Sequence, residues 1–253
     1  MAVTGVILVL FIIGHTVGNL QIYLGRETYN NYAYFLQSLG ELLWIIRIAL
    51  LLSLIFHIIT SIRLKIMNLA AKPQKYQVKN YIKAKLTSRT MIWTGIMAFV
   101  FIAYHLLHFT MGVINPQDFG HKEYYEKNVS YYYSQGQCMG MQQTEEQTNI
   151  KFEGKAFSEI PGSKLLFERH DVYYNLIKSY QKLPISLFYV VFVIFLGFHL
   201  NHAIQSAFQT LGFNHPKYTP KIIACSKCLS TILVLCLISI PITVYLGLVG
   251  GGV

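Results

Sequence analysis

Five long apolar runs constrain this chain more than any other feature of its sequence. Each run is near the ~20 residues that a membrane-spanning helix needs, and Arg47 is the one charged side chain well away from a run end. Over the whole chain only 13% of residues are charged, against about 25% in an average soluble domain. We therefore expect an all-α integral membrane bundle, a single domain over residues 1–253. Its five transmembrane helices are predicted at about 2–24, 42–66, 91–114, 184–211 and 226–249.

Basic residues gather in two of the connections between these runs. Residues 63–90 hold eight Lys and Arg and no acidic residue, and residues 212–227 hold three Lys and again no acid. Short basic loops stay on the cytoplasmic side of a membrane. We therefore expect a multi-pass protein of the inner (cytoplasmic) membrane, in preference to the mitochondrial inner membrane, with the N-terminus inside and the C-terminus outside. The net charge of +10 then indicates lipid headgroups or a peripheral protein partner, and not nucleic acid.

The first four runs each carry a histidine near the middle: His15, His57, His105 and His199. An ionisable side chain at that depth is by default functional. Counted at 1.5 Å per residue, His15 and His105 lie roughly 13 Å from the outer ends of their helices, and His57 and His199 roughly 13–18 Å from the inner ends. This predicts an outer pair, His15 with His105, and an inner pair, His57 with His199. Two b-type haems, each held by two imidazoles, would use all four side chains, and such haems transfer electrons because no coordination position stays open.

Several other side chains are candidates for the same sites. His108 and His202 stand three residues after His105 and His199 and share nearly the same helical face, so they remain alternative ligands or propionate partners. Arg47 is predicted to neutralise a propionate of the outer haem; the alternative is that it reaches toward the outer headgroups.

Smaller polar residues and glycines could support the histidines. The candidates for orienting imidazoles or propionates are Asn19, Ser53 and Ser61. Glu41 is a candidate proton acceptor for quinol at the outer mouth, with a hydrated loop end as the equally favoured alternative. Small residues next to the histidines either leave room for a flat macrocycle or are ordinary helix contacts: Gly14, Gly18, Gly112, Gly197 and Ala203.

The connections carry fewer signals. Residues 115–183 are predicted to be an outer-side insertion without long apolar periodicity, ending in an amphipathic piece at 171–183 that would lie along the outer interface. Cys225 and Cys228 form a lone C-x-x-C without a following His or a second such pair, which predicts a structural role. We expect no internal repeat beyond the recurring apolar–His pattern.

Four segments resemble helices one to four of a known family: FIIGHTVGNL, SLIFHIITSIRL, FIAYHLLHFT and FLGFHLNHAIQSAFQTLGFNHP. The family is the five-helix, di-haem (b558-type) cytochrome b membrane anchor of succinate dehydrogenase and fumarate reductase. The resemblance covers the chain apart from about residues 117–168, where the insertion departs from the family. It implies iron ligation by one histidine on each of helices one to four, with the inner haem between helices two and four.

The resemblance also implies partners and a role. A FAD-bearing flavoprotein and an iron–sulfur subunit would bind the inner face, and electrons would pass between them and menaquinone or ubiquinone in a respiratory chain linked to the tricarboxylic acid cycle. No succinate chemistry would occur on this chain. Two other functions stay open: the cytochrome b anchor of a hydrogenase or formate dehydrogenase, and a haem-free, proton-coupled transporter whose histidines relay protons.

Overall fold

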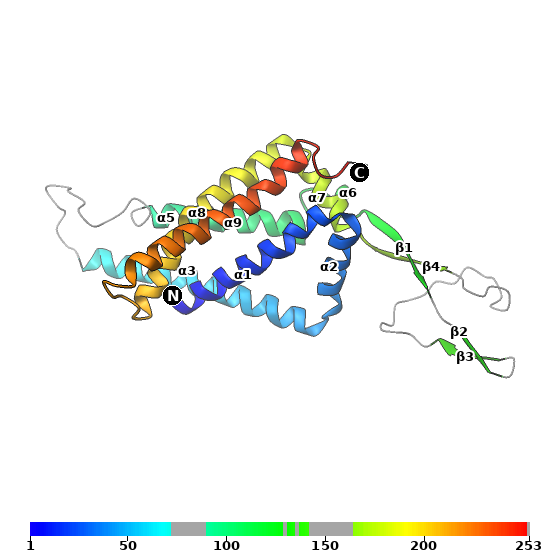
Figure 1. The fold of residues 1–253 in the computed structure, drawn as a ribbon. Helices are drawn as coiled ribbons and strands as arrows, with labels where there is room; N and C mark the ends of the chain where they lie inside the picture. The colour runs from blue at the N-terminus through cyan, green and yellow to red at the C-terminus, as the bar shows by residue number, and fades with distance from the viewer. Residues whose placement is uncertain (72–89, 129–130, 135–136, 142–163, 252–253) are drawn as a thin grey trace. The chain divides into compact units, whose positions relative to one another are not determined.

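The computed structural model describes residues 1–71, 90–128, 131–134, 137–141 and 164–251. Within these residues, five helical segments are long and apolar enough to cross a membrane. They are α1 (Ala2–Leu20) continued by the 3-10 turn η1 (Gln21–Leu24), α3 (Glu41–Ala70), α5 (Met91–His105) continued by η2 (Leu106–Thr110), α8 (Leu183–Thr210) and α9 (Thr219–Tyr245) (Figure 1). These are the five predicted spans, so the chain has the helix content of a multi-pass membrane protein.

The ends of three helices differ from the predicted ends. The last helix begins at Thr219 and not near 226, because Pro220 in its first turn suits a helix start. The third segment ends at Thr110 and not at 114, because Gly112 adopts a left-handed φ of 67° that no helix can continue through. The second helix runs on to Ala70. Most of the basic connection, residues 72–89, lies outside the described residues.

The chain forms two compact units, Met1–Gly120 with Val172–Val253, and His121–Asp171. The second unit contains strands, so an all-α description is wrong there. Strand β1 (Lys122–Asn128) pairs antiparallel with β4 (Lys164–His170), and β2 (Tyr131–Ser134) pairs with β3 (Gln137–Met141). These strands are short, and β1 and β2 are rich in tyrosine, which favours β-structure without giving a long apolar period.

Helix α7 (Val172–Tyr180) is the centre of the buried core of the first unit. The prediction of an amphipathic segment lying along the outer interface is wrong for it, because most of its side chains are buried: Tyr173, Asn175, Leu176, Ile177, Ser179 and Tyr180. Helices α2 (Arg26–Ser38), α6 (Pro116–Phe119), α8 and α9 all contact it and cover its faces. We call this region, where α2, α6 and α7 meet the long helices, the α7 end of the bundle.

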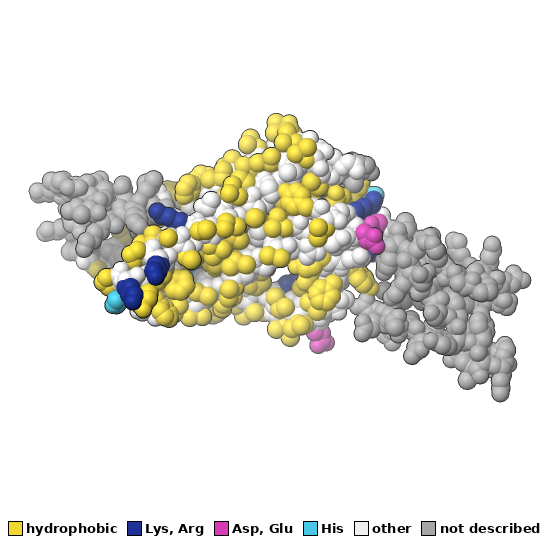
Figure 2. Space-filling view, in the orientation of Figure 1, with side chains coloured by type: hydrophobic (Ala, Val, Ile, Leu, Met, Phe, Trp, Pro, Cys, Tyr) yellow, Lys and Arg dark blue, Asp and Glu magenta, His cyan; other side chains and the backbone are white. Residues whose placement is uncertain are grey.

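The opposite end of the bundle holds Ala71, Thr90 and the connection at residues 211–218, and we call it the basic end. On the face shown in Figure 2, many apolar side chains lie between the two ends, and most of the charged side chains lie toward the ends. Helix α3 contacts α1 and has no buried residue, with large apolar side chains such as Trp44 and Ile59 more than half exposed. An apolar surface of this kind suits contact with lipid or with an apolar ligand.

Candidate functional site

Four histidines from four helices meet in two pairs. The imidazole rings of His15 on α1 and His105 on α5 have their centres 5.7 Å apart, with their planes at 86°. The rings of His57 on α3 and His199 on α8 have centres 6.5 Å apart, with planes at 72°. The structure therefore brings together the two couples that the depth count predicts. All four side chains are half-buried.

The ring separations are suited to one metal ion held between each pair. An imidazole nitrogen binds a first-row metal at about 2.0–2.1 Å and lies roughly 1.1 Å from its ring centre, so two imidazoles on opposite sides of one ion have centres roughly 6.3 Å apart. In the described part of the chain, no group of three or more His, Cys, Asp and Glu side chains is placed to share an ion. A porphyrin supplies four nitrogens of its own, so two imidazoles complete its iron. The donor set fits a haem at each pair.

Aromatic rings surround the pair at the α7 end. Phe11 stacks on His15 with ring centres 5.4 Å apart. The rings of Phe101, Phe109 and Tyr189 lie 5.6–6.0 Å from that of His105. The Tyr189 hydroxyl is also 3.5 Å from Nδ1 of His105. If His105 bound a haem iron through Nε2, this contact at Nδ1 would remain.

His108 is fully buried beside this pair, and the protein occupies both of its ring nitrogens. Nδ1 lies 3.1 Å from the Tyr189 hydroxyl, and Nε2 lies 3.0 Å from Oγ of Ser179 and 3.2 Å from Nδ2 of Asn115. His108 belongs to the π-helical turn η2, a type of turn common at functional sites. Of the two candidates on this helix, His105 is the one that faces another histidine.

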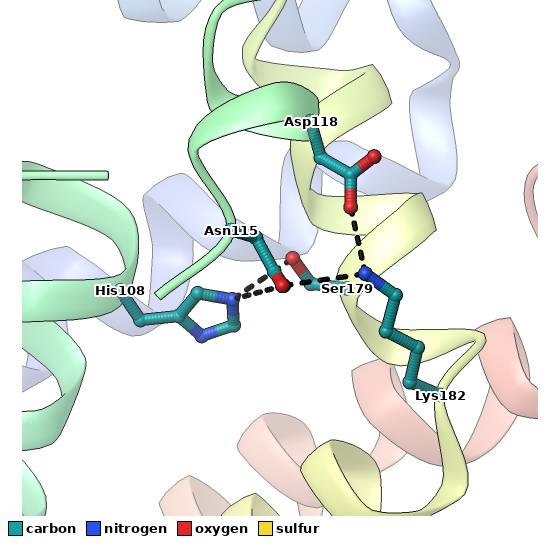
Figure 3. Close-up of polar contacts among 5 residues, drawn as sticks. All are labelled: His108, Asn115, Asp118, Ser179 and Lys182. Atoms are coloured by element: carbon teal, nitrogen blue, oxygen red, sulfur yellow. Dashed lines mark hydrogen bonds and ion pairs between the residues drawn. The ribbon is translucent and has the colours of Figure 1, made fainter. Parts of the chain in front are cut away.

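A hydrogen-bonded chain runs from His108 to a partly exposed ion pair (Figure 3). Lys182 Nζ donates to Oδ1 of Asn115 over 3.3 Å and forms a 2.8 Å ion pair with Asp118. Because Asn115 uses its oxygen for Lys182, its amide nitrogen donates to Nε2 of His108, and the His108 proton then lies on Nδ1, facing Tyr189. These hydrogen bonds link His105, through Tyr189 and His108, to Lys182 and Asp118, which are in contact with solvent. Such a series of hydrogen bonds can relay a proton or polarise the His105 imidazole.

Two threonines that were not predicted from the sequence contact the histidine pair at the basic end. The Thr4 hydroxyl oxygen is 3.4 Å from Nδ1 of His57, and the Thr94 hydroxyl oxygen is 3.3 Å from Nδ1 of His199. A glycine follows each threonine. A signal for them exists in the sequence, because TGVILVLFIIGH in α1 and TGIMAFVFIAYH in α5 repeat the same Thr-Gly-to-His spacing. The expectation of no repeat beyond the apolar–His pattern is therefore wrong.

The predicted small polar residues contact the backbone of the histidines. The Asn19 amide donates to the carbonyl oxygen of His15 over 2.7 Å and accepts a hydrogen bond from the Tyr29 hydroxyl over 3.2 Å. Ser61 donates to the carbonyl oxygen of His57 over 2.6 Å. Such bonds within or beside a helix hold the backbone near a ligand and leave the ring to other residues.

The remaining candidates lie at varied positions in the fold. Ser53 and His202 are half-buried on α3 and α8. Arg47 is exposed on α3, with its guanidinium 5.2 Å from the ring centre of Trp44, and Glu41 is the exposed first residue of α3. Cys225 and Cys228 are free and exposed.

Most of the predicted small residues are helix contacts. A Cβ on Gly18 would lie 2.5 Å from the Tyr32 hydroxyl, one on Gly197 would overlap Val234, and one on Gly112 would overlap Phe119. Gly14 differs, because a Cβ there would meet nothing within 4 Å. Only Gly14 of these four therefore leaves open space beside a histidine.

Comparison with known proteins gives no assignment: the chain matches no protein-family model, no curated protein and no solved structure. Its function is therefore argued from the histidine pairs and from the sequence.

Proposed function

We propose that this chain is a membrane cytochrome that binds two b haems, one between His15 and His105 and one between His57 and His199. The observation that carries the proposal is the pairing itself: imidazoles from four separate helices meet two by two, with ring centres 5.7 and 6.5 Å apart. A bound haem would supply a reversible one-electron couple at each pair. Two nitrogen ligands per iron leave no position for oxygen, so the role of the imidazoles is to hold an electron-transfer centre.

We further propose that the chain is the membrane-anchor subunit of a succinate dehydrogenase or fumarate reductase. The resemblance of its four histidine-bearing segments to that family supports this, as does the basic surface at one end. Exposed Lys217 and Lys221 lie in that surface beside the α8–α9 turn, and positive charge there suits a peripheral partner. An iron–sulfur subunit with a FAD-bearing flavoprotein would bind the basic end, and menaquinone or ubiquinone would react in the membrane.

The hydrogen-bonded chain at the α7 end supports a quinone-linked role. Quinol oxidation releases protons and quinone reduction takes them up, so a site for either needs a route to water. Tyr189, His108 and Asn115 connect the His15–His105 pair to Lys182 and Asp118. Glu41, an exposed carboxylate at the start of α3, is the proposed proton acceptor for quinol.

The test is haem stoichiometry on the purified full chain and on four single variants. We expect about two haem b per chain by pyridine haemochrome, and about one in each of His15→Ala, His57→Ala, His105→Ala and His199→Ala. The first and third variants should lose the same haem, identified by its midpoint potential, and the other two variants should lose the other. His215→Ala, in an exposed turn, is the matched control.

The alternatives give different results. A colourless protein would favour a proton-coupled transporter, in which the half-buried histidines relay protons. Retention of both haems by His199→Ala would move the ligand to His202. Copurification of a FAD-bearing, succinate-oxidising partner separates the succinate dehydrogenase family from the hydrogenase and formate dehydrogenase anchors.

A further inference from the structure

Helices α1 and α5 carry the same arrangement of functional residues at the same spacing. In each helix a Thr-Gly step stands near the start, at Thr4-Gly5 and Thr94-Gly95, and the histidine follows eleven residues after the threonine. Eleven residues of α-helix advance roughly 16 Å along the axis. Each helix therefore donates a histidine to the pair at the α7 end and presents a Thr-Gly step to the pair at the basic end.

The two Thr-Gly steps contact the two basic-end imidazoles in the same way. Each threonine oxygen lies beside Nδ1, at 3.4 Å for His57 and 3.3 Å for His199. Each glycine lies beside the Nδ1–Cε1 edge of the ring: a Cβ added to Gly5 would be 3.4 Å from Cε1 of His57, and one added to Gly95 would be 3.4 Å from Cε1 of His199. A methyl group would just touch the ring, and any longer side chain would compete with it for space.

The direction of these hydrogen bonds follows from the threonine hydroxyl protons. Thr4 donates to the carbonyl oxygen of Met1 over 2.8 Å, and Thr94 donates to that of Met91 over 3.1 Å. A hydroxyl has one proton to donate, so each threonine oxygen is left as an acceptor. With each hydroxyl proton on its carbonyl acceptor, the imidazole donates from Nδ1–H to the threonine oxygen, and Nε2 keeps a lone pair.

We propose that Thr4 and Thr94 are positioning residues, which fix the Nδ1–H tautomer and the ring orientation of His57 and His199 so that both present Nε2 to one haem iron. This inference rests on the proposed function. In metal sites, donation from the second ring nitrogen raises the basicity of the ligand. A more basic imidazole stabilises the ferric state, so loss of the threonine hydroxyl should raise the midpoint potential of that haem.

A helical threonine can also bond to a carbonyl three or four residues earlier, an interaction that holds the backbone and does not orient an imidazole ring. Thr60 on α3 does this: its hydroxyl donates to the carbonyl oxygens of Phe56 and His57. Thr60→Val is therefore the matched control for Thr4→Val and Thr94→Val, because valine keeps the branched shape and removes the hydroxyl in all three.

The experiment is a spectroelectrochemical titration of the full chain in its native membrane, for the unsubstituted protein and the three valine variants. Thr4→Val and Thr94→Val should each shift the Fe(III)/Fe(II) equilibrium of the basic-end haem threefold to tenfold toward Fe(II), a rise of about 30–60 mV. The other haem and the Thr60→Val control should keep the potentials of the unsubstituted protein. The low-spin electron paramagnetic resonance signal should change for the same haem only.

The outcomes separate this inference from the proposed function. Absence of haem from the unsubstituted chain would overturn the proposed function and, with it, this inference. Two haems with unchanged potentials in both threonine variants would overturn this inference alone, as would a shift of the α7-end haem. If Thr4→Val or Thr94→Val loses haem, serine at the same position should restore it with its potential, and failure of serine to do so would assign the threonine to packing.

Discussion

The two histidine pairs have the same composition but different surroundings. At the α7 end, His15 and His105 lie among Phe11, Phe101, Phe109 and Tyr189, next to the buried core around α7. At the basic end, His57 and His199 rest on two Thr-Gly steps, and α3 has no buried residue. One pair is thus embedded in a packed and hydrogen-bonded core, whereas the other depends on a few close contacts between helices. The α7 end should therefore dominate the stability of the first unit.

The largest expected effect compares a core isoleucine with one on α3. Ile177 on α7 is fully buried, so Ile177→Ala should lower the free energy of unfolding by about 2–4 kcal/mol through lost packing and a residual cavity. Ile59 on α3 is 54% exposed, and Ile59→Ala should stay within about 0.5 kcal/mol. Thermal unfolding of both variants in detergent measures this. Equal losses of stability would show that the α7 end is no more important than α3.

The second prediction concerns the hydroxyl that joins the α7-end pair to His108. Tyr189→Phe leaves the buried Nδ1–H of His108 without its acceptor, which should cost about 1–3 kcal/mol. It should also change the midpoint potential of the haem proposed at the α7 end and leave that of the haem proposed at the basic end unchanged. Tyr104→Phe is the matched control, because Tyr104 also lies beside His108, with ring centres 5.7 Å apart. Equal changes in stability and in midpoint potential in Tyr189→Phe and Tyr104→Phe would argue against a specific role for the hydrogen bond between Tyr189 and His108.

The third prediction is a loss of stability at alkaline pH that originates at the α7 end. Burial raises the pKa of Tyr180 on α7 well above its usual value of 10.0, and burial followed by the charge of Tyr32 raises the pKa of Tyr29 on α2. The folded-state pKa lies above the unfolded one, so the stabilisation is fully present below pH 10 and is lost as pH rises. Above that pH each tyrosine should remove about 1.4 kcal/mol per pH unit.

The measurement is the unfolding temperature between pH 8 and pH 11. Tyr180→Phe should flatten the alkaline decline, whereas Tyr218→Phe, at an exposed position, should leave it unchanged. A decline that is as steep in Tyr180→Phe as in the unsubstituted protein would exclude this tyrosine as its source.

The smallest expected effect is at the exposed end of the hydrogen-bonded chain. Asp118→Asn removes the 2.8 Å ion pair with Lys182, whose side chains are 21% and 48% exposed. Exposed pairs contribute about 0–1 kcal/mol and are screened by salt. The difference in stability from the unsubstituted protein should therefore vanish at high salt. Glu41→Gln, at an exposed acid on α3, is the control, and a loss that persists in high salt would point to packing.

Residues that act along one helix could be predicted from the sequence. The five spans follow from the length of the apolar runs, and the rise per residue is constant, so the depth of each histidine follows from counting. That count predicted the couples His15–His105 and His57–His199, which the structure brings together. The Thr-Gly steps could also have been found, because the repeat in α1 and α5 is visible in the printed sequence.

Other features depend on which helix lies beside which, and periodicity alone does not contain that information. Gly18 and Gly197 are close contacts with Tyr32 and Val234, not space for a macrocycle. The amphipathic pattern of residues 172–180 cannot distinguish a lipid surface from a protein core, because both accept an apolar face. Tertiary packing decided that α7 is buried, that His108 is bonded on both ring nitrogens, and that Thr4 and Thr94 meet imidazoles on other helices. Hydropathy and spacing along the chain determined the spans and the depths, whereas side-chain contacts between distant segments formed only when the helices packed.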